Sequence, residues 1–254
     1  MADWLRPDWP ASGRVGAICT TRHGGVSVAP YDSLNLAGHV GDSASAVRVN
    51  RHNWEGALDG ARPVLLRQVH GCGVATLDGA SVDDCEFDAA VTVTAGLACV
   101  VQVADCLPVL LCDRSGTRVA AAHAGWRGLA GGVLLRTLES ICAPRQAQPA
   151  CAATEIIAWL GPCIGPSAFE IGPEVRAALL TAQPGSETAF RRGQGDRWYA
   201  DLANLARRQL QQLGVEVHGN DGSSSWCTLT QAQRYFSYRR DGITGRMAAA
   251  VWLR

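Results

Sequence analysis

Much of the chain between residues 63 and 124 consists of short apolar runs in which polar residues do not alternate with apolar ones. The runs are PVLLRQVH, GVATL, AAVTV, LACVVQVA, PVLLC and TRVAAAHA, and each has the length of a β-strand. A strand with one face in solvent alternates apolar and polar residues, whereas a strand covered on both faces is apolar throughout. The segment therefore predicts a sheet packed between other layers.

Helical patterns flank this strand-rich segment. The clearest covers residues 201–214, where Leu202, Leu205 and Leu210 fall on one stripe and Gly214 would end the helix. Further helices are predicted at residues 43–58, 125–143 and 173–183, and further strands within residues 14–21, 155–165 and 236–253. No internal repeat or linker divides the pattern, so we expect one α/β (α+β) domain over residues 1–254.

The charge balance and the choice of basic residue exclude several partners and mechanisms. Equal numbers of acidic and basic residues, 23 of each, give no field that favours nucleic acid or an anionic membrane. Every basic residue is arginine, because the sequence contains no lysine. This excludes Schiff-base chemistry at a lysine and a phosphate-loop lysine, so a cationic side chain that binds phosphate must be a guanidinium.

The cysteine pattern and the apolar run lengths indicate a reduced, cytoplasmic protein. The ten cysteines include no CxxC pair, and we see no signal segment at the N-terminus. The longest apolar runs are strand-sized and fall short of the roughly 20 residues that a membrane span requires. We therefore expect a small-molecule ligand, with no nucleic acid and no membrane as partner.

A long polar segment, residues 22–47, offers the first candidate binding residues. It is rich in Gly, Ser, Asp and Asn without helical periodicity, which predicts a surface loop, and long ordered loops are often functional. Its candidates for substrate contact are Ser33, Asn35 and His39, and the helix predicted next adds Arg51 as a candidate anion contact. The alternative is that these residues are turn formers and a solvated arginine.

Two histidines and one cysteine stand where apolar runs give way to loops. They are His70 in RQVHG, Cys106 in ADCLPVLL and His123 in AHAGWRG. Zinc accepts imidazole nitrogen and thiolate sulfur, and a catalytic zinc keeps a fourth position for water or substrate. The three residues have the right number and type of ligands, although their separations match no short ligand motif. The alternative is a core cysteine with two hydrogen-bonded histidines.

The same residues allow a second mechanism. Cys106 beside a histidine can be a thiolate nucleophile, with the second histidine or Asp105 orienting the base. Next to a metal ligand, Asp105 can instead act as a proton shuttle or as a hydrogen-bond partner of a ligand, or it can simply accept a backbone hydrogen bond. Cys163 is a further thiol candidate and Trp126 a candidate for stacking on a base, with buried core positions as the alternative for both.

Six motifs, taken together, resemble those of the laccase-domain, or multicopper polyphenol oxidase-like, family. They are TRHGGVSVAPYDSLNLAGHVGD, QVHG, ADCLPVLL, AHAGWRG, GPCIGPSAFEIG and FSYRRDGITGRMAA, and they occur in the family's order along the chain toward the C-terminus. Members of this family are now understood as purine nucleoside phosphorylases.

The resemblance implies a single domain of layered mixed β-sheets flanked by helices, similar to cysteine hydrolases of the cytotoxic necrotizing factor type. It also implies one Zn²⁺ per chain, held by His70, Cys106 and His123. The implied substrates are purine nucleosides and phosphate. Adenosine, inosine, guanosine or methylthioadenosine would be cleaved to base and ribose 1-phosphate, and adenosine would also be deaminated. The older label of the family is copper-dependent oxidation of phenols.

The histidine content distinguishes among these chemistries. A multicopper oxidase needs many histidines in paired His-x-His motifs, whereas this chain has six histidines and no such pair. Multicopper oxidation is therefore disfavoured, although adventitious copper at a His, Cys, His site is expected. Deamination and phosphorolysis need only one metal, and we expect Arg51 or Arg246 to help bind phosphate.

Three hypotheses from different classes remain. The first is a zinc-dependent purine nucleoside enzyme. The second is a metal-free cysteine hydrolase or amidase, for instance one acting on a cell-wall precursor. The third is a binding or partner-regulating protein whose zinc is structural, and it predicts that Cys106→Ser unfolds the chain. No particular protein partner is predicted.

Overall fold

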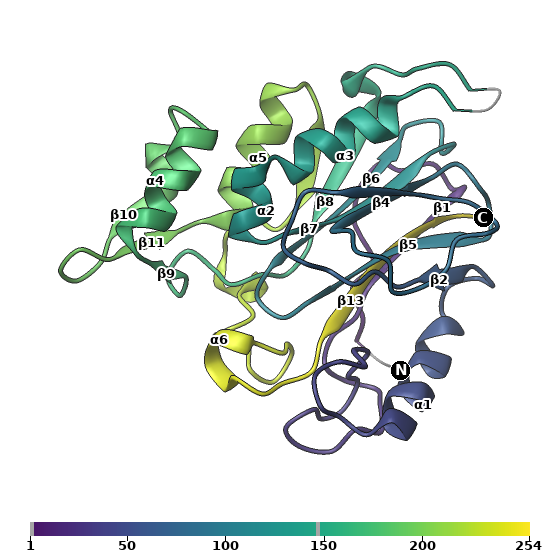
Figure 1. The fold of residues 1–254 in the computed structure, drawn as a ribbon, viewed down its shortest axis with the longest axis horizontal. Helices are drawn as coiled ribbons and strands as arrows, with labels where there is room; N and C mark the ends of the chain where they lie inside the picture. Colours follow the sequence, from purple (N-terminus) through teal and green to yellow (C-terminus); the bar gives the residue numbers. More distant parts are fainter. Residues whose placement is uncertain (1–2, 146–147) are drawn as a thin grey trace.

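Two mixed β-sheets, stacked face to face, form the centre of the molecule (Figure 1). The computed structural model describes residues 3–145 and 148–254. One sheet has the strand order β1 (Val15–Cys19), β13 (Met247–Leu253), β5 (Leu97–Val103), β2 (Arg62–Val64). The other has the order β12 (Glu216–Gly219), β8 (Ile156–Leu160), β6 (Leu107–Asp113), β7 (Val119–Ala124), β4 (Ala89–Thr92), β3 (Val74–Leu77). Parallel and antiparallel pairs occur in both sheets.

Three apolar layers hold the two sheets and their helices together. Alternate residues of facing strands, such as Val101 and Leu110, fill the space between the sheets. The helices α3 (Val133–Cys142) and α5 (Leu202–Gln212) cover the outer face of the six-stranded sheet. Helix α1 (Ala44–Glu55) covers the outer face of the other sheet through Trp54. Every residue of β5, β6, β7 and β13 is buried, which confirms the prediction of strands covered on both faces.

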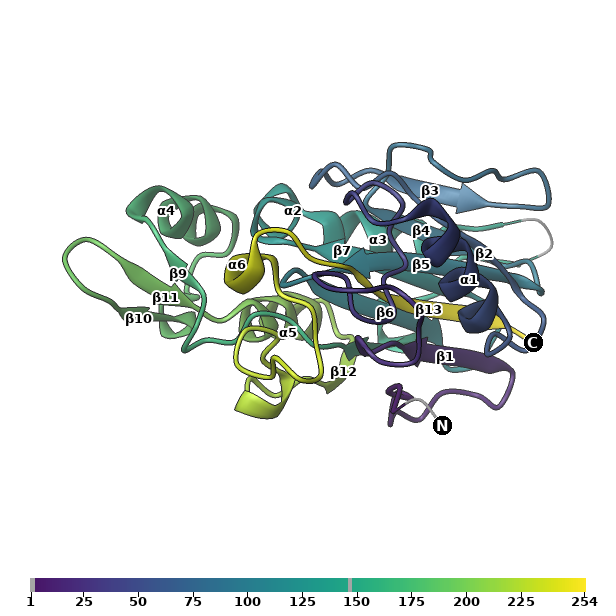
Figure 2. The same cartoon turned by 90° about the horizontal axis from the view of Figure 1, so that it is seen from below.

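A third, small sheet projects from one end of this stack (Figure 2). It consists of β10 (Phe190–Arg192), β11 (Trp198–Ala200) and β9 (Glu170–Ile171), in that order, beside helix α4 (Pro173–Ala182). Short 3₁₀ turns occur at Ala153–Glu155, Glu187–Ala189 and Ser224–Trp226. The strand patterns in the sequence did not predict this sheet, because its strands are only two or three residues long.

Two sequence predictions near the candidate site were wrong. The strand expected over residues 63–70 ends at Val64. Beyond Val64, backbone amides form hydrogen bonds with side chains instead of with a neighbouring strand; for example, the amide of His70 donates to Asp88. The helix expected over residues 125–143 is divided into α2 (Trp126–Gly131) and α3 by Gly132, whose φ of 85° lies in the left-handed region. Within the described residues, no helix has the length and apolar character to cross a membrane.

Candidate functional site

The fold brings the three candidate metal ligands together at one end of the sheet stack. His70 lies in the loop after β2, Cys106 in the turn from β5 to β6, and His123 near the end of β7. Pairing of Pro108 with His123 across β6 and β7 brings Cys106 next to that histidine. One ligand atom from each of the three lies within 4.8 Å of the others, and the two imidazole rings meet edge to face at 4.9 Å.

The buried carboxylate of Asp88 connects two of these ligands. It accepts a hydrogen bond from His123 Nδ1 at 2.8 Å and bonds from the backbone amides of Val69, His70 and Gly71 at 3.2, 2.9 and 2.7 Å. The bond at Nδ1 leaves Nε2 of His123 for Cys106 or a metal. The amide bonds fix the loop that carries His70, whose φ is 59°. The sequence analysis missed Asp88, and its only signal was an acidic residue directly before the apolar run of β4.

Charge interactions within the cluster favour a thiolate. Burial alone would raise the pKa of Cys106, but the adjacent imidazoles of His123 and His70 outweigh it and lower the pKa to about 6. Burial alone would lower the pKa of His123, but the Cys106 thiolate and Asp88 raise it to about 9. Burial opposes ionisation of Asp88 as well, and its bonds to His123 and Gly71 nevertheless lower its pKa. Cys106 is therefore ionised at neutral pH, which is the form that binds a metal.

These residues fit a zinc ion. Two imidazole nitrogens and one thiolate sulfur are ligands that zinc prefers, and a carboxylate on the remote nitrogen of a ligating histidine is a common companion of such sites. His123 is 3% exposed and Cys106 half-buried, whereas His70 is exposed, so the cluster opens on one side. Three protein ligands with an open side correspond to a catalytic rather than a structural zinc site.

A glycine beside the cluster explains one of the sequence motifs. A Cβ atom on Gly125, the residue after β7, would lie 2.9 Å from the sulfur of Cys106 and 3.4 Å from the ring of His70. Any side chain there would push the ligands apart. The glycine in AHAGWRG is thus required for the close approach of the chain to the thiolate.

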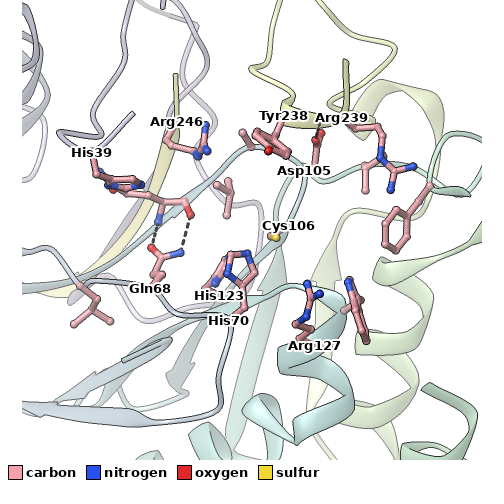
Figure 3. A pocket seen from close by; sticks show the side chains of 17 residues that line it. His39, Gln68, His70, Asp105, Cys106, His123, Arg127, Tyr238, Arg239 and Arg246 are labelled. Atoms are coloured by element: carbon pink, nitrogen blue, oxygen red, sulfur yellow. Dashed lines mark hydrogen bonds between the residues drawn. The ribbon is translucent and has the colours of Figure 1, made fainter. Parts of the chain in front are cut away.

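The open side of the cluster faces a cavity of about 540 Å³. Figure 3 shows His39 and Arg246 on one flank of the ligands and Arg127 and Arg239 on the other. The residues that line it are His39, Leu66, Gln68, His70, Gln102, Val103, Ala104, Asp105, Cys106, His123, Trp126, Arg127, Ile164, Phe169, Tyr238, Arg239 and Arg246. The volume is that of a small-molecule site.

The sequence predicted substrate contact for four polar residues of the N-terminal loop and of the helix that follows it. Only two of them are connected to this cavity. His39 lines it, and Asn35 supports it. Asn35 is fully buried, and its Oδ1 accepts from the backbone amides of Ala37 and Arg246, each at 3.0 Å. It therefore positions Arg246 instead of facing a ligand.

Ser33 and Arg51 lie outside the cavity lining. The hydroxyl of Ser33 accepts from the backbone amide of Gly25 at 3.2 Å, and Nε of Arg51 donates to the carbonyl of Leu36 at 2.9 Å. Arg51 acts on the cavity through its charge, because it is one of the cations that lower the pKa of His39. Among the residues predicted for substrate contact, His39 and Arg246 are the two that line this cavity.

Asp105 lines the cavity but both of its carboxylate oxygens are engaged. Oδ1 accepts from the hydroxyl of Thr228 and Oδ2 from the backbone amide of Arg239, both at 2.6 Å. The residue has a φ of 95°, so the chain turns sharply just before Cys106. These contacts agree with the alternative that Asp105 accepts a backbone hydrogen bond. They connect the C-terminal segment to the loop that carries Cys106.

The other two sequence candidates have contrasting surroundings. Cys163 is buried, and burial together with the nearby Asp201 raises its pKa well above the ordinary value, so it is a poor nucleophile. Trp126 lines the cavity, with the guanidinium of Arg127 at 4.4 Å from its ring. Sequence reasoning did not identify the other aromatic and basic lining residues, which are Arg127, Phe169, Tyr238 and Arg239.

We expect Asp88→Asn to weaken zinc binding by about 10–100-fold, the range typical for loss of such a histidine partner. An amide can accept from His123 through one oxygen but cannot supply the negative charge or all four hydrogen bonds. A chelator competition titration with apo protein measures the change. Asp113→Asn is the matched control, because that carboxylate also accepts several bonds but stands at the end of β6, where its donors are residues of the following turn. Equal zinc affinity in Asp88→Asn and the parent would contradict the role of Asp88.

His39 is expected to remain neutral at pH 7. Partial burial lowers its pKa below the ordinary 6.5, and the cations Arg246 and Arg51 lower it further against an opposing effect of Asp84. Removing one cation should shift the pKa upward, so Arg246→Met should show a higher His39 pKa in a histidine NMR titration. Arg48→Met, which leaves both of these cations in place, should leave it unchanged. A parent pKa at or above 6.5 would contradict the assignment.

Comparison with known proteins gives relatives over the whole chain. A purine nucleoside phosphorylase of Pseudomonas aeruginosa is 49% identical, with 100% of this chain and 99% of that protein covered. The purine nucleoside phosphorylase YfiH of Escherichia coli is 46% identical, with 100% of both chains covered. A crystal structure of a Neisseria meningitidis protein superposes with a TM-score of 0.89 at 45% identity, covering 99% of each chain.

A more distant solved structure and a family model agree with these relatives. YlmD from Geobacillus stearothermophilus has a TM-score of 0.86 at 31% identity, covering 99% of this chain and 96% of that one. The model of the family described as multi-copper polyphenol oxidoreductase laccase matches residues 16–254, which include every residue of the His, Cys, His cluster and its cavity. The chain belongs to the multi-copper polyphenol oxidoreductase laccase family.

Proposed function

We propose that this protein is a zinc-dependent purine nucleoside phosphorylase that acts as one domain over residues 1–254. Its substrates would be adenosine, inosine, guanosine or methylthioadenosine together with phosphate, and its products the base and ribose 1-phosphate. Adenosine deamination would occur at the same site. The observation that carries the proposal is a His, Cys, His ligand set that opens into a cavity with arginines and aromatic rings in its walls. The names of the relatives support the same substrate class.

The phosphate would bind on the flank formed by Arg246 and His39. Nη1 of Arg246 donates to the carbonyls of Thr244 and Gly245, each at 3.0 Å, which holds the guanidinium in place. Nε and Nη2 make no hydrogen bond within residues 3–145 and 148–254, so they are free to donate to two oxygens of an anion. A neutral His39 can donate one more bond without adding a charge.

The nucleoside would occupy the remaining part of the cavity. Trp126, Phe169 and Tyr238 line it and offer ring faces to a purine, and Arg239 lies 5.5 Å from the ring of Phe169. Held in this way, the ribose C1′ stands between the base and the phosphate. The C1′–N9 bond breaks as a C1′–O bond to hydrogen phosphate forms, and the base leaves with the proton that the hydrogen phosphate loses.

A zinc ion bound by His70, Cys106 and His123 would supply a Lewis acid at this point of the cavity. The protein's part is to keep Cys106 ionised, to hold His123 in one tautomer through Asp88, and to aim Arg246 at the anion. A fixed cation such as Arg246 would stabilise the negative charge that develops in the reaction. Copper at the same ligands would account for the phenol oxidation in the family's older label as a side activity.

Product analysis with adenosine tests the proposal. Zinc-loaded protein should form adenine and ribose 1-phosphate only when phosphate is present, whereas inosine should form with or without phosphate. The same assay with inosine should give hypoxanthine in a phosphate-dependent way. If neither base nor inosine is formed from adenosine at any phosphate concentration, the nucleoside function is wrong.

One further candidate function has a specific observation in its favour. Cys106, His123 and Asp88 form a hydrogen-bonded series of thiolate, imidazole and carboxylate, as in a cysteine hydrolase. A metal-free cysteine hydrolase or amidase, acting for instance on a cell-wall precursor, would use the same three side chains. The two functions differ in the need for a metal: a hydrolase of this kind is active after chelation, and the phosphorylase is not.

A further inference from the structure

Two cysteines that the proposed mechanism does not use lie opposite each other far from the cavity. Cys142 is the last residue of α3, and the backbone amide of Cys151 donates to its carbonyl at 3.1 Å. Arg145 and Gln148 form an antiparallel bridge between them. This bridge and the hydrogen bond place Cys142 and Cys151 on opposite sides of the same turn.

The distance between the two residues suits a disulfide. The backbone bond from Cys151 to Cys142 places them side by side, and a disulfide spans Cα separations of about 4.4–6.8 Å. Both side chains are half-buried and pack against the same apolar core. Burial, together with the thiol of Cys151 beside it, raises the pKa of Cys142 to about 12.

Arg118 already holds the two sides of this turn together. Its Nη1 donates to the carbonyls of Ile141 and Ala143 at 3.0 and 2.8 Å, and its Nη2 donates to the carbonyl of Pro149 on the opposite side. Arg118 is 3% exposed, so these are buried, charge-assisted bonds. A covalent bond between the cysteines would thus close a turn that the fold already keeps closed.

We propose that Cys142 and Cys151 are an oxidation site that forms an intramolecular disulfide with a peroxide as oxidant. The sulfur of Cys151 attacks one peroxide oxygen, which breaks the O–O bond, releases water and leaves a sulfenic acid. The sulfur of Cys142 then attacks the sulfur of Cys151, forms the S–S bond and releases a second water, which takes up the thiol proton. Cys142 takes the second step because its raised pKa leaves little thiolate to react with the peroxide.

The oxidation site is separated from the metal ligands by the length of a strand. Arg118 immediately precedes β7, and His123 lies five residues further along the chain, which corresponds to about 16 Å of extended strand. In Figure 1 the C-terminal end of α3 points away from α2 and α6. The disulfide should therefore stabilise the protein without removing the zinc or the activity.

The test uses zinc-loaded protein treated with hydrogen peroxide. Alkylation of the remaining thiols and peptide mapping without reductant should reveal one linked peptide pair containing Cys142 and Cys151, with a mass 2 Da below the sum of the reduced peptides because two hydrogens are lost. Thermal unfolding of the oxidised parent should shift upward by a few degrees, because the loop between the cysteines is closed. Zinc content should not change.

Two variants make the result specific. Cys142→Ser and Cys151→Ser should each lack the linked pair and the thermal shift, while Cys85→Ser, which removes an exposed thiol elsewhere, should keep both. The proposal fails if Cys142 and Cys151 both remain alkylatable in the parent under conditions that oxidise Cys85. It also fails if either cysteine is found linked mainly to a different cysteine.

Discussion

Cys106→Ser is expected to lower the zinc content from about one ion per chain to near zero and to reduce adenosine phosphorolysis by at least about 100-fold. Serine keeps the size of the side chain but does not ionise near neutral pH, whereas the cysteine has a pKa of about 6. The cluster would then retain two imidazoles and lose the one ligand that neutralises charge on the ion. Elemental analysis and the adenosine assay on protein purified without added metal measure both effects.

The matched control for this change is Cys72→Ser. Cys72 is half-buried near Gly131 and follows the loop that carries His70, but it is not part of the ligand cluster. It should keep zinc and activity near the parent values. A catalytic site also predicts that Cys106→Ser stays folded. Global unfolding of Cys106→Ser, with an unaffected Cys72→Ser, would instead favour a structural zinc.

Arg246→Met is expected to reduce kcat/KM for phosphate in phosphorolysis by about 100-fold, while the variant still binds zinc. Two hydrogen bonds from the free Nε and Nη2 to a phosphate would each contribute about 1.5–3 kcal/mol, and a loss of about 3 kcal/mol corresponds to about 100-fold. Methionine preserves most of the apolar stem of the arginine. Initial rates at varied phosphate and fixed inosine separate this effect from nucleoside binding.

Deamination provides an internal control for Arg246, because it consumes no phosphate. In Arg246→Met, the rate of inosine formation from adenosine without phosphate should fall much less than the rate of base release with phosphate. Arg246→Lys should restore part of the phosphate dependence, since it keeps a charge but not the planar pair of donors. An unchanged KM for phosphate in Arg246→Met would show that the anion binds elsewhere, with the opposite flank at Arg127 and Arg239 as the next candidate.

The sequence predicted the three candidate ligands that the fold brings together, but not the carboxylate that contacts two of them. His70, Cys106 and His123 were recognisable because each stands at the end of an apolar run and because the surrounding motifs resemble a known family. Asp88 was not recognisable, because its importance depends on which backbone amides and which ring nitrogen approach it in space. Likewise, Asn35 looked like a substrate ligand in the sequence, and only the fold shows that it is buried against the backbone of Arg246.

The limits of the fold prediction have a similar cause. The continuous apolar runs identified β5, β6 and β7, because strands buried on both faces leave a strong pattern. The sequence QVHG also follows an apolar run, yet Gln68 bonds through its side chain to the backbone of Gln102, with Nε2 to the carbonyl at 2.8 Å and Oε1 to the amide at 2.7 Å. A side chain that bonds to the backbone of a strand, in place of a neighbouring strand, leaves no periodic pattern in the sequence. The projecting sheet of β9, β10 and β11 is too short to leave one.

Zinc reconstitution of the stripped protein tests the central claim most directly. Protein freed of metal by a chelator is titrated with zinc, and the rate of adenine and ribose 1-phosphate formation is measured after each addition. We predict no phosphorolysis before zinc is added, a rise that saturates at one ion per chain, and no rise in Cys106→Ser. Full activity in the stripped protein, or a rise that is the same in Cys106→Ser as in the parent, would contradict a zinc-dependent phosphorylase built on His70, Cys106 and His123.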